Sequence, residues 1–213
     1  MRREKVNEHG QADLSTFSLT TVEAEIALES INHEDRVNVI EVILTNNRLE
    51  YVPETLKLFT NMQFLWLGAN CIKHLPDWIG DLTALKKLGI NNNVLCEIPR
   101  SIGKLTNLKG LYCENNQLSS VPSSLVKLTK LCDIQIYNNC QLPPHLRVYI
   151  SNDHFETRVF LHMVALEEWR PRARAASIRW MLIASCHLGI CKDIAVLIGR
   201  MVYKSRGEDV WEF

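Results

Sequence analysis

Five asparagines recur along the middle of the chain at a constant interval of 23 residues; they are Asn47, Asn70, Asn93, Asn116 and Asn139. Around them, apolar residues return at positions 1, 4, 6, 11, 14, 18 and 21 of each unit, and a proline follows position 14 in the four full units. A constant period of this length indicates a solenoid, in which each coil buries its apolar side against its neighbours. This repeat therefore constrains the fold more than any single residue does.

Within a unit, positions 4 and 6 are two residues apart, which predicts a short strand with both side chains pointing into the core. The asparagine follows that strand. Its amide can both donate and accept hydrogen bonds, so we expect it to satisfy backbone groups of the turn inside a narrow coil. The five asparagines are therefore predicted to form a structural ladder along the solenoid.

The pattern LxxLxLxxNxLxxLPxxIxxLxx resembles the leucine-rich repeat, in the 23-residue intracellular form typified by Ras-binding and Ras-suppressor scaffold proteins. The resemblance covers about residues 39–142, as four full units and a truncated fifth. It implies an α/β fold: a right-handed solenoid with a concave parallel sheet and short helical or irregular turns on the convex side. It also implies protein–protein recognition as the commonest role.

The segment before the repeats is expected to close the first coil, because an exposed end coil would leave apolar surface bare. Residues 1–18 are interpreted as a polar N-terminal tail and residues 19–38 as the cap. Thr20 with Glu23 three residues later is a capping box. Together with the apolar spacing that follows, it predicts a helix over 21–33.

The segment after the repeats, residues 143–213, carries no recognised resemblance and is expected to form a helical cap or a small helical domain. Its apolar spacing and its Pro171 and Gly189 predict helices at 154–170, 171–187 and 192–206. The most hydrophobic run, 180–191, is about 12 residues long against the roughly 20 needed to span a bilayer. We therefore expect a buried helix there rather than a membrane span.

Charge and cysteine content narrow the class of protein. Lys plus Arg and Asp plus Glu both number 24, so the formal net charge is zero, which argues against gripping nucleic acid or an anionic membrane surface. The chain has seven cysteines, an odd number that cannot all pair in disulfides within one chain. The N-terminal residues lack the apolar core of a signal peptide. We expect free thiols and an intracellular, cytoplasmic location.

Candidate binding residues lie between the inward-facing strand positions, where side chains point to the concave face. Four aromatic residues gather there and are predicted to anchor a partner, and three charged residues are predicted to set specificity. Gly89 and Gly110 lie between the aromatic positions and are expected to leave a shallow recess. The alternative is that some of these aromatics pack against the terminal segments or lie singly on the surface. The predicted set is Phe64, Trp66, Lys87, Tyr112, Glu114, Asp133 and Tyr137.

Signatures of other site types are weak. The stretch CHLGIC at 186–191 has no second cluster at metal-site spacing, and no phosphate-binding loop or dinucleotide fingerprint occurs. The arginines of 170–179 are interpreted as the solvated start of a helix rather than as a nucleic-acid contact. We predict no catalytic, cofactor or metal site.

The leading hypothesis is a non-enzymatic module that binds a protein, such as a small GTPase or a signalling or ubiquitin component, on the concave face. In one alternative the C-terminal helices recruit a second complex, which would make the protein an adaptor. In another, the C-terminal segment is the catalytic part of an effector enzyme. In a third, the concave aromatics mediate self-association.

Overall fold

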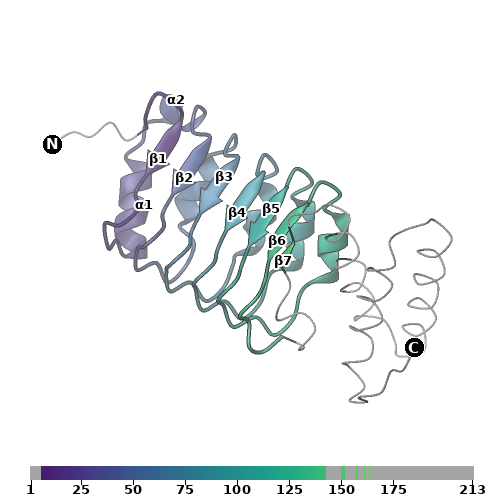
Figure 1. Ribbon diagram of the computed structural model, residues 1–213. Coiled ribbons are helices and arrows are strands. Elements are labelled where there is room, and N and C mark those ends of the chain that lie inside the picture. The colour runs from purple at the N-terminus through teal and green to yellow at the C-terminus, as the bar shows by residue number, and fades with distance from the viewer. Residues whose placement is uncertain (1–5, 143–149, 152–156, 158–160, 162–163, 165–213) are drawn as a thin grey trace, which may run out of the picture.

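The computed structural model describes residues 6–142, 150, 151, 157, 161 and 164 (Figure 1). In this part of the chain, seven strands form one sheet in sequence order, parallel from β1 to β6 and antiparallel between β6 and β7. The strands are β1 (Gln11–Asp13), β2 (Glu41–Ile43), β3 (Phe64–Trp66), β4 (Lys87–Gly89), β5 (Gly110–Tyr112), β6 (Asp133–Gln135) and β7 (Ile150–Ser151).

The register of the sheet follows the 23-residue period. Phe64 pairs with Lys87, Lys87 with Gly110, and Gly110 with Asp133, so equal positions of successive units lie side by side. The middle residue of each repeat strand is buried, and position 6 is buried as well. The sequence prediction of short parallel strands with inward-facing positions 4 and 6 is therefore confirmed.

Short 3-10 helices cover the side of the solenoid opposite the sheet (Figure 1). Each begins directly after the proline of its unit, where a residue without an N–H leaves no ladder donor unpaired. Each also buries the apolar residue at position 18 against the strands. These helices are η1 (Glu54–Leu58), η2 (Asp77–Asp81), η3 (Arg100–Lys104) and η4 (Ser123–Lys127).

A row of buried asparagine amides joins consecutive coils. The Oδ1 atom of Asn93 accepts a hydrogen bond from the backbone N–H of Ile72 at 2.9 Å. Its Nδ2 donates to the carbonyls of Leu67 at 3.0 Å and Ile90 at 3.1 Å. The same arrangement recurs at Asn47, Asn70, Asn116 and Asn139. Each amide thus satisfies backbone groups of its own coil and of the preceding one.

The residue just before each ladder asparagine has a left-handed backbone, with φ between 53° and 56° in all five coils. Asparagine tolerates this conformation better than most residues. The exposed amides form a second row, in which Asn115 donates to Asn92 at 2.9 Å and Asn138 donates to Asn115 at 2.8 Å. The residues at this position are Asn46, Ala69, Asn92, Asn115 and Asn138.

The N-terminal segment closes the first coil with more structure than the sequence indicated. The capping box of Thr20 and Glu23 is present, and α1 runs over Thr21–Glu29 with Ala24 and Leu28 buried. The helix predicted over 21–33 nevertheless ends at Glu29, and a second short helix follows it. The second, α2 (His33–Arg36), starts anew because the side chain of Asn32 accepts from the N–H of Asp35 and caps it.

Strand β1 lies within the residues interpreted as a polar tail. It pairs with β2 and buries Ala12 completely. With three residues and one buried apolar side chain, it is too short to produce a visible periodicity in the sequence. Residues 1–18 are therefore not simply a tail, because this edge strand extends the sheet by one position.

After the repeats, β7 pairs antiparallel with β6, although only helices were expected beyond 142. Thr157, Leu161 and Val164 are helical and buried, and the hydroxyl of Thr157 donates to the carbonyl of Cys132 at 3.1 Å. Leu161 and Val164 belong to the same apolar core as the coils. The helices predicted at 171–187 and 192–206 lie outside the described residues.

Candidate protein-binding surface

The outward side chains of the strands form one surface, here called the sheet face, which corresponds to the concave face of the sequence analysis. Phe64 and Lys87 are neighbours in the row that begins at Gln11 and ends at Asp133. The next row contains Trp66, Gly89 and Tyr112. Most of the predicted binding residues are partly buried here, as are Glu41 and Gln135.

Two of the predicted anchors contact each other. The rings of Trp66 and Tyr112 stack with their centroids 5.9 Å apart and an interplanar angle of 26°. They come from β3 and β5, and β4 between them contributes Gly89 to the same row. The stack therefore bridges the intervening strand at its glycine.

The recess expected at Gly89 and Gly110 is not present. A β-carbon on Gly89 would lie 2.5 Å from Cε3 of Trp66, and one on Gly110 would lie 2.8 Å from the hydroxyl oxygen of Tyr112. The aromatic side chains thus occupy the space above the glycines. The glycines make room for the aromatic pair rather than for a ligand.

Carboxylates hold the polar atom of each ring. The indole Nε1 of Trp66 donates to Glu41 at 2.7 Å, and Glu41 also accepts from the amide of Gln11 at 2.8 Å. At the other end, the hydroxyl of Tyr112 donates to Oδ2 of Asp133 at 2.5 Å. A continuous series of side-chain contacts, three hydrogen bonds and one ring stack, therefore crosses the sheet face from β1 to β6.

Sequence reasoning gave Glu41 and Gln11 no role. Glu41 occupies the same unit position as Phe64 and Asp133, so its place on the sheet face could be read from the repeat. Its hydrogen bond to Trp66 depends on how the indole is turned, which the repeat does not specify. Gln11 precedes the repeats and gave no comparable signal.

Negative charge on the sheet face is incompletely satisfied. Glu114 is only 8% exposed, and its Oε2 has no hydrogen-bond partner; the same holds for Oδ1 of Asp133. Burial raises the pKa of Glu114 above its ordinary value of 4.5, and the charge of Asp133 adds to this effect, against a hydrogen bond to its own backbone. Burial, followed by the hydrogen bond to Asp133, raises the pKa of Tyr112 above its ordinary value.

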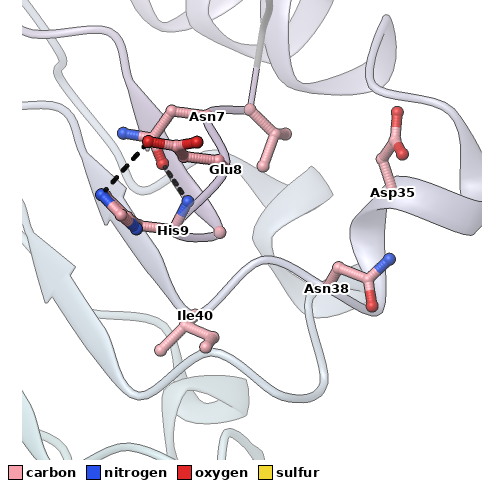
Figure 2. Close-up of a pocket in the computed structure, with 8 residues that line it drawn as sticks. Asn7, Glu8, His9, Asp35, Asn38 and Ile40 are labelled. Carbon is pink, nitrogen blue, oxygen red and sulfur yellow. Dashed lines mark hydrogen bonds and ion pairs between the residues drawn. The ribbon is translucent and has the colours of Figure 1, made fainter.

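A hollow lies at the N-terminal end, between the segment leading into β1 and helix α2; Figure 2 shows it. Its volume is about 480 Å³. The N–H of His9 donates to Oδ1 of Asn7 at 3.0 Å, and its ring lies 3.7 Å from Glu8. The side chains of His9 and Glu8 are both at least 80% exposed, so their contact adds little binding energy. The lining residues are Val6, Asn7, Glu8, His9, Gly10, Asp35, Asn38 and Ile40.

In the described part of the chain, no group of three or more His, Cys, Asp or Glu side chains could hold a metal ion. None of the described helices is long and apolar enough to cross a membrane. The described cysteines are free, and burial raises the pKa of the Cys113 thiol.

Part of the chain matches a known protein family, and one solved structure shares its fold. A family model described as a leucine-rich repeat region matches residues 77–151. No curated protein matches the chain. A solved leucine-rich repeat protein of Leptospira interrogans superposes with a TM-score of 0.56 and 24% identity over 73% of this chain. An internalin (inlF) from Listeria monocytogenes gives a TM-score of 0.42 and 20% identity over 51% of this chain.

The chain spans about a third of those two solved structures, 34% and 35% of their respective lengths. At this identity the first of them shows the fold alone. Residues 77–151 thus resemble a leucine-rich repeat region, and such regions generally serve as protein-binding modules.

Proposed function

We propose that this protein is a non-enzymatic interaction module that binds a protein partner on its sheet face. The observation that carries the proposal is the stacked pair of Trp66 and Tyr112, with Glu41 and Asp133 fixing the polar atom of each ring. Aromatic side chains supply much of the binding energy at protein interfaces. Rings that are already held in place lose less conformational entropy when a partner docks.

The other predicted residues surround this pair. Phe64 and Lys87 lie in the neighbouring row, and Glu114 and Tyr137 follow β5 and β6. Phe64 and Tyr137 add apolar contact area, whereas Lys87, Glu114 and Asp133 discriminate between partners by charge. The partner class we favour is a small GTPase or a signalling or ubiquitin component. The odd number of cysteines supports an intracellular setting.

The test is affinity capture with full-length protein, comparing wild type with Trp66→Ala/Tyr112→Ala after both give the same circular dichroism. The matched control is Tyr51→Ala, because Tyr51 is an aromatic residue that is 51% exposed and lies off the strands. We expect partners to be lost from the double variant and retained by the control. A photo-crosslinker at position 87 should then label the same partner, and one at position 104, on η3, should not.

Retention of every partner by the double variant would refute binding through the aromatic pair. Self-association is the competing explanation of an aromatic surface. It predicts that wild type, but not the double variant, sediments faster as the concentration is raised. A monomer at all concentrations removes that alternative.

A further inference from the structure

We propose that the partner inserts an arginine side chain onto the stacked rings of Trp66 and Tyr112, between carboxylates that flank the stack. This inference rests on the proposed function and names the chemistry that the sheet face takes. Glu41 on β2 lies at one end of the stack and Asp133 on β6 at the other. Glu114 follows Tyr112 by two residues, just after the end of β5, and its charge acts on the Tyr112 hydroxyl.

The first argument is that the negative charge on this surface is not neutralised within the described part of the chain. The ion pairs found there join Glu8, Glu54 and Asp81 to cations, and none of them involves Glu41, Glu114 or Asp133. Among the described residues, Glu41 and Asp133 accept hydrogen bonds from an amide, an indole and a phenol. Neutral donors orient a carboxylate but leave its charge in place, so these carboxylates are available to a cation of the partner.

The second argument is the environment of the acidic oxygens. Oε2 of Glu114 and Oδ1 of Asp133 have no hydrogen-bond partner and are shielded from solvent. Water therefore solvates these charges poorly, and the attraction of a nearby cation is stronger than it would be at an exposed pair. A cation on the adjacent ring faces acts on them through space without having to reach the shielded atoms.

The third argument is the aromatic platform itself. A cation over the face of a Trp or Tyr ring is attracted by the ring quadrupole. The guanidinium of arginine is planar, lies flat on such a face and keeps its N–H donors in the plane, pointing outward toward carboxylates at the edge. A lysine ammonium is a compact and strongly hydrated charge, so it is less suited to contact a ring face and the flanking carboxylates at the same time.

Other cationic or anionic ligands fit less well. The described residues offer no cluster of three metal-binding side chains. The phosphates of a nucleic acid would meet the carboxylates of Glu41, Glu114 and Asp133, and Lys87 adds one positive charge in the row of Phe64 and Gly110. The surface therefore favours a basic protein segment over a metal ion or a nucleic acid.

The test uses the full chain, immobilised, and three fluorescent pools of random peptides. The pools are identical except for a central residue that is arginine, lysine or citrulline. Citrulline has the shape of arginine without its charge. We expect wild type to retain about tenfold more of the arginine pool than of the citrulline pool, with lysine between them. Equal retention of the arginine and citrulline pools, including retention of neither, would overturn the inference.

Variants of the carboxylates show which residues produce the preference for arginine. Glu114→Gln/Asp133→Asn keeps the side-chain shapes and an acceptor for the Tyr112 hydroxyl, and we expect it to reduce the arginine preference to near unity. Glu41→Gln tests the other end of the stack independently. An arginine preference that persists in both variants overturns the proposed site. Partner capture that is lost in Trp66→Ala/Tyr112→Ala yet unchanged in the carboxylate variants would refute the arginine inference alone; capture unchanged in all of them would refute the proposed function as well.

Discussion

The ring of Trp66 lies so close to Gly89 that a β-carbon on the glycine would stand 2.5 Å from Cε3 of the indole. Gly89→Ala should therefore push the indole out of its stack with Tyr112 and weaken its bond to Glu41. Overpacking of this kind costs about 1–3 kcal/mol of stability. Chemical denaturation should show a loss in this range, and near-ultraviolet circular dichroism should change.

A double-mutant cycle separates this clash from a general effect of adding a methyl group. In a Trp66→Ala background the obstructing ring is absent, so Gly89→Ala should then have almost no effect on the free energy of unfolding. Equal losses in both backgrounds would mean that Trp66 does not occupy the space above Gly89.

The two asparagine rows predict unequal costs for neighbouring substitutions. Asn93→Ala removes an amide that serves backbone groups of two coils, and each buried group left unpaired costs about 1–3 kcal/mol. Asn92 is exposed, and its Oδ1 accepts from Asn115. Asn92→Ala should therefore cost less, chiefly through its left-handed backbone. Thermal melts that show equal losses for the two variants would contradict the role of the inner row.

Much of the fold follows from the repeat alone, because equal spacing forces equal positions into register. The buried residues Leu65, Leu88 and Leu111 can be identified without coordinates, and so can the outward direction of Trp66 and Tyr112. The rotamer of the Trp66 side chain cannot be identified from the repeat. Whether the indole turns toward Glu41 or away depends on contacts between neighbouring coils, and a pattern of residue types does not encode them.

The ends of the solenoid were harder to predict, for a related reason. A repeat is recognised by recurrence, and an end segment occurs once. Strand β1 pairs Ala12 with Val42, 30 residues later rather than 23, because helix α1 is inserted between them. The strand pairs in the same register as the others, but its spacing in the sequence differs from the 23-residue period. The repeat therefore does not reveal this strand.

Ala69 interrupts the outer row of asparagines and offers a route to higher stability. Its φ is 55°, a left-handed conformation that disfavours alanine and that asparagine tolerates. Ala69→Asn should stabilise the protein by about 0.5–1 kcal/mol and could join Asn92 to Asn46 through its amide. Ala69→Ser is the control, since serine is polar but gains less in this conformation. A melting temperature for Ala69→Asn at or below that of Ala69→Ser would contradict the explanation.

Glu114 makes a pH-dependent contribution to the stability of the folded protein, and the direction of its pKa shift gives the sign. Burial and the nearby charge of Asp133 raise the pKa of Glu114 in the folded state above the ordinary value of 4.5. The folded protein therefore holds this proton more tightly than the unfolded chain does. As pH rises through the unfolded and then the folded pKa, ionisation destabilises the folded state, and above the folded pKa the whole cost is present.

Glu114→Gln removes that cost. The variant should gain stability relative to wild type as pH rises from about 4 to about 7, and its advantage should become constant above the folded pKa. Glu97→Gln is the matched control, because Glu97 is exposed and lies in the irregular segment between β4 and η3 rather than on a strand. Melting temperatures of the three proteins across this range provide the measurement. A gain that shrinks as pH rises would mean that a hydrogen bond to the ionised carboxylate outweighs its burial.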